Sequence, residues 1–322
     1  MLDRRTFLLS SLALLATSAC GQDTAQPAAS PSTGAVPSQG AYPRTVEHEL
    51  GSTTLETAPQ RIVCGTDGGE LCSLLALGVQ PVGYGLRQDP TPTWLTGLVD
   101  GLDSYDLSGG ETNFERIAAW APDLVLVQKG FATPETLPRF TDVAPTVATS
   151  FADWRTNLRQ VGQAVGLEEQ AGALEADKDA LVAEARTRLP ASATGLRLNA
   201  IAAFDDGSIY VLNDQSPAGK LSAALGLAPL PGQATEGEVV DLLSAEQLSA
   251  VDGDLLLLLH FGDGDGMPAL QEKSVYQDLA VVQAGNVVDL TKDESDAIYF
   301  DSVLTIEPNL ALLERLVAAA AR

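Results

Sequence analysis

The chain has 322 residues, of which 43 are Asp or Glu and only 19 are Lys or Arg, so its formal net charge is −24. So acidic a chain is repelled by nucleic-acid phosphates and by anionic lipids, which argues against nucleic acid as a partner and against electrostatic attachment to a membrane. Hydrophobic residues make up 45% of the chain, and about 280 residues beyond the N-terminal segment are more than one compact core usually holds, which points to two lobes.

The first residues have the pattern of an export signal. Arg4 and Arg5 precede a short apolar run that ends in small residues just before Cys20. This pattern is typical of a secretory signal, and the run is too short to span a bilayer of about 30 Å. The arginine pair resembles the twin-arginine type, and the last four residues resemble a lipobox, in which cleavage leaves a lipidated Cys20 as the N-terminus. We therefore expect a signal peptide at residues 1–19 and an extracytoplasmic chain anchored to the cell membrane by lipid on Cys20. An ordinary signal with an incidental cysteine is the alternative, and the export route, twin-arginine or general secretion, stays open.

Residues 20–42 have the composition of a flexible tether. Gly21 to Ala41 is almost entirely Gly, Gln, Ala, Pro, Ser and Thr, and Val36 is its one large apolar residue. Such a segment cannot bury enough apolar surface to offset the entropy of ordering it. We expect a lipidated Cys20 followed by a linker.

Short apolar strands then alternate with helices over residues 43–152. Continuous apolar strands between helices are typical of a buried, largely parallel sheet. An opening hairpin around Gly51 is expected at the edge of this sheet. The expected strands are 61–65, 81–85, 124–127 and 146–149, the hairpin strands are 45–50 and 52–56, and a helix covers 69–77. Cys64 and Cys72 are expected to be two buried unpaired thiols, with a disulfide between them as the alternative.

The longest helical stretch runs from Asp153 to Leu189. It contains no proline, and Leu174, Leu181 and Ala185 keep one face apolar at helical spacing. A single helix of this length would reach up to about 50 Å at 1.5 Å per residue. We predict a connecting helix at residues 153–190 that joins two lobes.

The alternation of strand and helix resumes after Pro190. The expected strands are 196–204, 209–212, 254–259 and 286–290, and the expected helices are 216–225, 244–250 and 308–321. We therefore predict an α/β fold with two Rossmann-like lobes, residues 43–152 and 191–322, whose central sheets are joined by one long helix and which enclose a ligand cleft.

Aromatic and basic residues gather where the predicted strands end. Ligands of open α/β sheets bind outside the carboxyl ends of the strands, so these residues should line the cleft. The candidate ligand-binding residues are Tyr84, Arg87, Trp94, Lys129, Trp154, Asn213, His260 and Tyr299. A structural role is the alternative for His260. The neighbouring Phe131, Phe151, Phe261 and Phe300 are interpreted as core or lobe-closing residues.

Three segments together resemble a known family. Pro59 to Val63 is followed by Leu74 to Gly83, Asn113 to Val127 sets a helix before an apolar strand, and Ser244 to Leu248 precedes the strand 254–259. In order and spacing, and after a lipobox, they resemble the solute-binding lipoproteins of ABC importers, of the helical-backbone class that serves ferric siderophores, haem and cobalamin. The resemblance covers roughly residues 43–320.

The resemblance implies a function and partners. Such a protein captures a ferric siderophore complex outside the cytoplasm and delivers it, as a monomer, to a membrane permease; haem or cobalamin is the alternative cargo. In that family one surface glutamate of each lobe docks against arginines of the permease, and the matching positions are Glu115 and Glu246. Each falls in the opening turn of a short helix, where a carboxylate also favours the helix dipole, so a capping role is the alternative.

The residue types suit such a cargo better than a bare metal or a reaction. Aromatic faces can cover the apolar body of a siderophore, while Arg and Lys donate charge-assisted hydrogen bonds to the oxygens around iron. We expect no cofactor, with iron carried only within the siderophore, because two histidines, His48 and His260, cannot form a multi-histidine metal site. The segment Asp263 to Gly266 lacks the spacing of an EF-hand and is interpreted as an acidic lid.

Signatures of enzymes are missing from the sequence. The chain has no Gly-x-Ser-x-Gly elbow, His-Glu-x-x-His pair or phosphate-binding P-loop. We therefore predict that it is not an enzyme. A tethered extracytoplasmic enzyme that uses the same cleft is the less favoured alternative.

Overall fold

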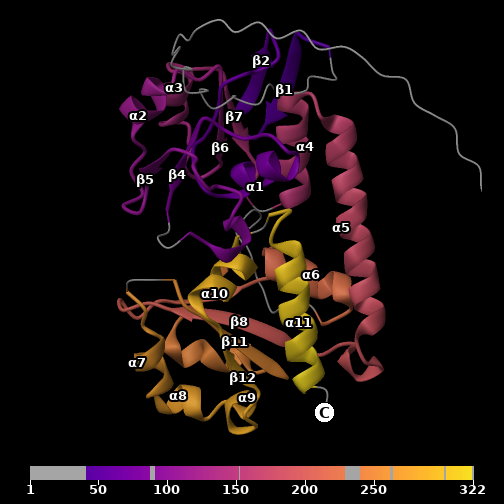
Figure 1. Cartoon of the computed structure of the whole chain (residues 1–322). Helices are drawn as coiled ribbons and strands as arrows, with labels where there is room; N and C mark the ends of the chain where they lie inside the picture. The colour runs from indigo at the N-terminus through magenta and orange to yellow at the C-terminus, as the bar shows by residue number, and fades with distance from the viewer. Residues whose placement is uncertain are drawn as a thin grey trace, which may run out of the picture. The chain divides into compact units, whose positions relative to one another are not determined.

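The computed structural model describes residues 41–87, 91–151, 153–228, 240–261, 264–300 and 302–320 (Figure 1). All of them belong to one compact unit, Gly34–Arg322. The expected signal peptide, Cys20 and nearly all of the expected linker lie outside the described residues.

The N-terminal lobe is built on a five-stranded sheet with the order β5-β4-β3-β6-β7, in which all neighbouring strands are parallel. The strands are β3 (Ile62–Cys64), β4 (Gly83–Leu86), β5 (Ser104–Asp106), β6 (Leu124–Gln128) and β7 (Thr146–Thr149), and the connecting helices are α1 (Gly69–Ala76), α2 (Phe114–Ala119) and α3 (Leu137–Thr141). Every residue of β3, β6 and β7 is buried, as expected of a parallel sheet that is covered on both faces. The apolar runs in the sequence therefore located the core of this lobe.

The opening hairpin does not join that sheet. β1 (Arg44–His48) and β2 (Gly51–Leu55) form a separate antiparallel pair, so the hairpin lies at the edge of the sheet, as expected, without adding a strand to it. The hairpin instead packs beside the edge strand β7, where the hydroxyl of Thr53 donates a hydrogen bond to the carbonyl of Thr146. A side-chain bond of this kind holds the hairpin in place without extending the backbone ladder.

The predicted connecting helix is two helices. α4 (Trp154–Val165) ends at Gly166, which adopts the left-handed conformation with φ 76°, and α5 (Glu168–Arg188) begins after Leu167. Glycine enters this conformation without the steric cost that a Cβ imposes, so it terminates a helix readily. The prediction of one uninterrupted helix from residue 153 is therefore wrong, because the left-handed conformation of Gly166 ends the first helix.

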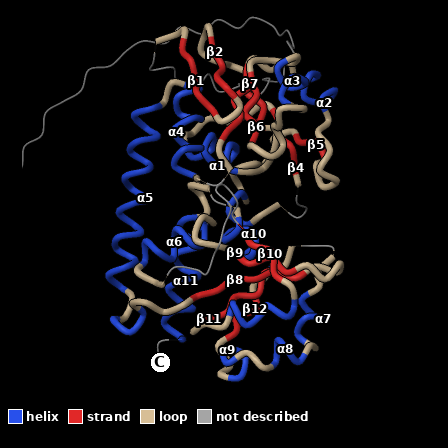
Figure 2. Tube along the Cα trace, turned by 180° about the vertical axis from the view of Figure 1, so that it is seen from behind, coloured by secondary structure: helices blue, strands red, loops and turns tan. Residues whose placement is uncertain are grey.

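A single long helix still connects the lobes. α5 has 21 residues, which is about 30 Å at 1.5 Å per residue. It contacts α4 of the N-terminal lobe and also α6 (Pro217–Leu225) and α11 (Ile306–Ala320) of the C-terminal lobe. Figure 2 shows it running alongside both lobes.

The C-terminal lobe has a mixed five-stranded sheet with the order β10-β9-β8-β11-β12. β8 (Leu198–Ala203) and β12 (Val287–Asp289) are parallel to the central β11 (Leu255–Leu259), whereas β9 (Ile209–Leu212) and β10 (Val240–Leu243) make antiparallel pairs. The remaining helices are α7 (Met267–Gln271), α8 (Ser274–Gln277), α9 (Ala280–Gln283) and α10 (Lys292–Tyr299), and the 3₁₀ helices η1 (Thr93–Leu95), η2 (Ala191–Ala193) and η3 (Ala245–Val251) complete the chain. Two Rossmann-like lobes are thus confirmed, with η3 in place of the α-helix expected at 244–250.

Both inner cysteines are buried and unpaired. Cys64 ends β3 and Cys72 lies on α1, within the hydrophobic core of the N-terminal lobe. The expectation of two free buried thiols is therefore confirmed. Among the described residues, no helix has the length and apolar character needed to cross a membrane.

Candidate functional site

A continuous line of half-buried aromatic side chains runs across the strand ends. Its members are Tyr210, Phe204, Phe261, Tyr299, Phe300 and Phe151, and we call it the aromatic array. Neighbouring ring centroids lie 4.8 to 6.4 Å apart, which is the range in which aromatic rings attract one another. Each of these residues is partly exposed, so the array is a candidate surface for stacking against a ligand.

The aromatic array joins the two lobes. Phe151 follows β7 of the N-terminal lobe, and its ring centroid lies 6.1 Å from that of Tyr299 and 6.4 Å from that of Phe300. Phe204 and Phe261 follow the parallel strands β8 and β11 of the other lobe. Phe151 and Phe261, which we interpreted as core or lobe-closing residues, thus follow the carboxyl ends of β7 and β11, and the contacts of Phe151 with Tyr299 and Phe300 agree with a lobe-closing role. Contact of these rings with cargo stays a prediction.

Arg87 extends this line on the N-terminal lobe. Its guanidinium carbon lies 4.3 Å from the ring centroid of Phe300 and 5.9 Å from that of Phe131, within the range of cation–π attraction. Arg87 Nε also donates a hydrogen bond of 2.5 Å to Asp67 Oδ1, and its backbone N–H donates one of 3.1 Å to Oδ2. Asp67 is only 3% exposed, so this ion pair is held rigidly at the ends of β3 and β4.

A second buried carboxyl lies three residues further on, in the first turn of α1. Glu70 is fully buried, and its Oε1 accepts hydrogen bonds from the backbone N–H and the hydroxyl of Thr66, at 3.0 and 2.7 Å. Within the described part of the chain its Oε2 has no partner. Burial raises the pKa of Glu70 to about 7, although the hydrogen bonds from Thr66 and the charge of Arg87 act in the opposite direction.

His260 lies between two carboxylates at the end of β11. Its Nδ1 is 2.6 Å from Asp265 Oδ2 and its Nε2 is 2.7 Å from Asp289 Oδ1. Burial lowers the pKa of His260, but hydrogen bonds to Asp289 and Asp265 outweigh that effect and raise it above its ordinary value. The backbone N–H of His260 donates to Ser295 Oγ at 3.0 Å. These partners give His260 a structural role at the edge of the site, and its contact with cargo stays a prediction.

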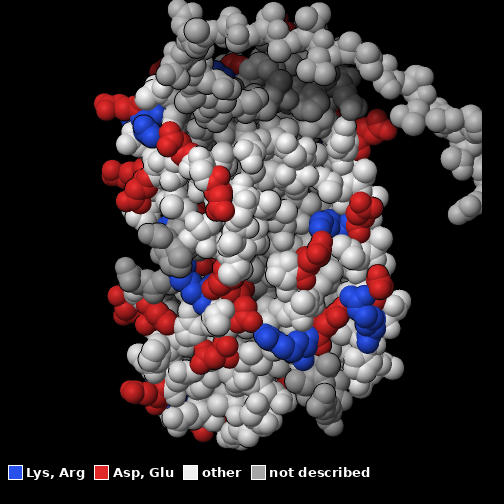
Figure 3. Space-filling model, in the orientation of Figure 1, with Lys and Arg blue, Asp and Glu red and all other residues white. Residues whose placement is uncertain are grey.

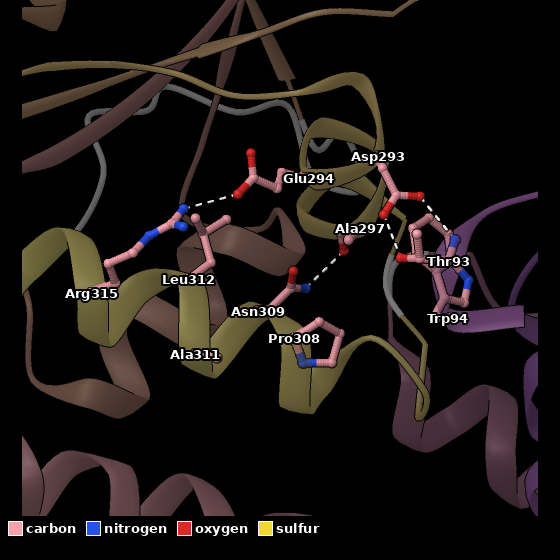
Figure 4. A pocket seen from close by; sticks show the side chains of 10 residues that line it. All are labelled: Thr93, Trp94, Asp293, Glu294, Ala297, Pro308, Asn309, Ala311, Leu312 and Arg315. Atoms are coloured by element: carbon pink, nitrogen blue, oxygen red, sulfur yellow. Dashed lines mark hydrogen bonds and ion pairs between the residues drawn. The ribbon is translucent and has the colours of Figure 1, made fainter. Parts of the chain in front are cut away.

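Trp94 lies at a different opening between the lobes. It lines a pocket of about 430 Å³ together with residues of α10 and α11, among them Leu312 and Arg315 (Figure 4). The neighbouring Thr93 donates a backbone hydrogen bond of 3.0 Å and a hydroxyl hydrogen bond to Asp293 of α10. Trp94 is thus half-buried beside an interlobe contact.

Tyr84 and Trp154 are not at the exposed strand ends. Tyr84 lies inside β4, which ends at Leu86, and is 4% exposed in the core of the N-terminal lobe. Trp154 is the first residue of α4 and is also 4% exposed. The ring of Tyr84 could reach a ligand only if its neighbours moved, whereas Trp154 lines a small pocket together with Pro217 and Leu221 of α6.

Asn213 lies at the opposite end of the strands from the predicted cleft, because of the direction of β9. It is fully buried and follows β9, which runs antiparallel to β8. The carboxyl end of β9 therefore lies at the opposite edge of the sheet from those of β8 and β11. Its Oδ1 accepts a hydrogen bond from the backbone N–H of Gln215, so Asn213 shapes its own loop. The prediction placed Asn213 at the cleft because it follows a strand, and this holds only for strands that run parallel to β8 and β11.

Lys129 follows β6, as predicted, but its ammonium group is paired with Glu49 of the hairpin turn. Both side chains are about half exposed. The ion pair directs Lys129 toward the hairpin, on the side of the sheet away from Arg87.

The two candidate docking glutamates are exposed in corresponding places. Glu115 lies in the first turn of α2 and Glu246 in the first turn of η3, one in each lobe. Asn113 caps α2, and Ser244 and Gln247 form a capping box at η3. Both side chains are exposed, but hydrogen bonds to its own backbone N–H and to Ser244 lower the pKa of Glu246, so its carboxylate also takes part in capping η3. Docking by either glutamate stays a prediction.

Sequence reasoning missed several residues of the site. Phe204 and Tyr210 were not singled out, nor were the acidic residues Asp67 and Asp289. Asp265 was part of the predicted acidic lid, but its pairing with His260 was not foreseen. Asp67 had a signal, because Thr66 and Asp67 follow the apolar strand β3 directly. The partners of His260 had none, because they come from different loops. Asp263 of the predicted acidic lid lies outside the described residues, and no group of His, Cys, Asp and Glu that could hold a metal ion is found among the described ones.

A model of the periplasmic binding protein family matches residues 107–294. Because the match covers more than half of the chain, the chain belongs to this family. It is 28% identical over 270 residues to the ferric enterobactin-binding periplasmic protein FepB of Escherichia coli. This match covers 73% of this chain and 83% of FepB. It is 34% identical over 151 residues to the probable siderophore-binding lipoprotein YfiY of Bacillus subtilis, a match that spans 45% of this chain and about half, 46%, of YfiY.

Solved structures share the fold. A periplasmic solute binding protein from Mycobacterium smegmatis superposes with a TM-score of 0.74 at 24% identity, over 86% of this chain and 98% of that one. The triscatecholate siderophore binding protein FeuA of Bacillus subtilis, complexed with ferri-bacillibactin, gives a TM-score of 0.72 at 18% identity over the same shares. At these identities the likeness concerns the fold alone.

Proposed function

We propose that this chain is the extracytoplasmic solute-binding component of an ABC importer that captures a ferric siderophore complex and delivers it to the membrane permease. The observation that carries the proposal is the aromatic array with Arg87 at its end, which crosses from one lobe to the other at the carboxyl ends of the strands. FepB and YfiY, whose names refer to ferric enterobactin and to a siderophore, support the same class of cargo.

The site is suited to holding such a complex without touching its metal. Half-buried rings can cover the apolar body of the siderophore, and the guanidinium of Arg87 can donate hydrogen bonds to its oxygens. Iron would be carried within the cargo, so the protein needs no cofactor of its own. We further propose that the protein acts as a monomer that releases its cargo chemically unchanged.

Delivery would use the two exposed glutamates. Glu115 and Glu246 stand at helix starts on the two lobes, so a permease that binds both contacts the two lobes together. We propose that arginines of the permease bind these carboxylates, and that lipid on Cys20 keeps the protein at the membrane where the permease resides.

The test is a fluorescence titration with the full chain in detergent. Trp94 is half-buried beside an interlobe contact, so a ligand that draws the lobes together should change its emission. A panel of ferric siderophores, haem and cobalamin is titrated, and bound cargo is recovered and examined by mass spectrometry. Saturable binding of a ferric siderophore that is recovered intact supports the proposal. Binding of haem or cobalamin alone, or recovery of a modified compound, contradicts it.

A further inference from the structure

We infer that the cargo is a ferric complex with no net negative charge, such as a neutral or cationic trishydroxamate, and that the buried Asp67 disfavours triply negative triscatecholate complexes. The inference rests on the proposed function and names the class of its cargo. It is drawn from the charges that surround the aromatic array.

Each basic side chain at the carboxyl ends of the parallel strands already has an acidic partner. Arg87 pairs with Asp67, Lys129 with Glu49, and His260 with both Asp265 and Asp289. On the face shown in Figure 3, the Lys and Arg side chains likewise lie next to acidic ones. The internal segments between the described ranges contain acidic residues and no Lys, Arg or His. The site therefore has no surplus of positive charge.

The pairing of Arg87 is the decisive contact. Asp67 is 3% exposed and receives both the Nε hydrogen and the backbone N–H of Arg87. An anionic ligand bound by the Nη groups of Arg87 would face the buried charge of Asp67 across the same guanidinium, which is unfavourable. The carboxyl of Glu70 is buried in the first turn of α1, so a negative ligand would also oppose the ionisation of that group.

A neutral complex fits the same geometry. Within the described residues the Nη groups of Arg87 make no ion pair, so they can donate hydrogen bonds while Nε stays on Asp67. The Arg87–Asp67 pair then supplies donors without net charge. Three singly charged hydroxamates cancel the charge of ferric iron, whereas three doubly charged catecholates leave three negative charges on the complex. The net charge of −24 on the chain adds long-range repulsion of the latter.

The experiment compares ferric complexes of different charge on the full chain in detergent, by isothermal titration calorimetry at fixed salt. The probes are ferrichrome as a neutral trishydroxamate, a trishydroxamate complex that carries one ammonium group, and ferri-bacillibactin as a triscatecholate. We expect the first two to bind at least about tenfold more tightly than the triscatecholate. If the triscatecholate binds more tightly, the inference is wrong and the proposed function stands. If none of the three binds, both are wrong.

Two variants test whether Asp67 causes the preference for complexes without negative charge. Asp67→Asn keeps an acceptor for Arg87 but removes the buried charge. It should reduce the ratio of the trishydroxamate affinity to the triscatecholate affinity by about tenfold. Glu184→Gln is the matched control, because it removes an acidic partner of Arg188 in an exposed pair of α5 that is not among the pairs at the strand ends, and it should leave the preference nearly unchanged. If Asp67→Asn folds, as judged by circular dichroism, and the preference stays as in the parent, Asp67 is not its source. If Asp67→Asn does not fold, the affinities of the three ferric complexes for the parent chain alone decide whether the inference holds.

Discussion

Replacing Glu70 by Gln should remove a pH dependence from the stability of the folded chain. Glu70 is fully buried, and its pKa of about 7 lies well above the 4.5 that is usual for glutamate. The folded state therefore holds the proton more tightly than the unfolded state. The stabilisation that comes from protonated Glu70 is complete below pH 4.5 and is lost as the pH rises through 7.

The size of the effect follows from the difference between the two pKa values. At 1.36 kcal/mol for each pKa unit, ionising Glu70 in place costs about 3 kcal/mol of the free energy of unfolding. In the Gln variant the amide oxygen can still accept both hydrogen bonds from Thr66, so the loop is preserved while the titration is abolished. Between pH 4.5 and pH 7.5 the free energy of unfolding of the parent should therefore fall by about 3 kcal/mol relative to that of the variant.

Urea denaturation of both proteins at several pH values measures this directly. Glu272→Gln is the control, because Glu272 is exposed and its replacement should leave the pH dependence as in the parent. Parallel pH profiles for the parent and Glu70→Gln would refute the reasoning, since they would show that Glu70 has the same pKa in the folded and unfolded states.

Three further predictions concern the core, delivery and anchoring. Gly83→Ala should destabilise the N-terminal lobe by about 1 to 3 kcal/mol, because its Cβ would lie 2.5 Å from the ring of the buried Trp120; an unchanged midpoint of thermal unfolding would contradict this. Replacing both Glu115 and Glu246 by Arg should leave cargo affinity nearly unchanged and stop uptake by cells, and normal uptake would show that these side chains do not dock. Cys20→Ala should release the protein from membranes on fractionation, and continued partition with membranes would exclude lipid attachment at this residue.

The sequence was informative where a single local pattern determines the structure. β6 and β11 are continuous apolar runs, and both were placed to within a residue. The starts of α2 and η3 were found because short helices precede those strands in both lobes. Such signals need no knowledge of distant residues, because burial on both faces of a parallel sheet imposes them locally.

The rest depends on contacts between distant segments. The break at Gly166 depends on a backbone conformation that apolar periodicity does not reveal. The direction of β9 decides whether Asn213 faces the cleft, and strand direction follows from pairing with β8. Likewise, the composition of the loops showed Arg87 as a cation at the site but not that Asp67 pairs with it.

The central claim is that an organic iron complex binds along the aromatic array between the lobes. Crystals of the chain grown with a ferric trishydroxamate, measured at the iron absorption edge, give the position of the metal without reference to any expectation. The account predicts one strong anomalous peak beside Arg87 and Phe300, with the organic ligand against the rings and no protein atom coordinating the iron. A peak in the pocket lined by Trp94 and Arg315 (Figure 4), or iron coordinated by protein side chains, would contradict it.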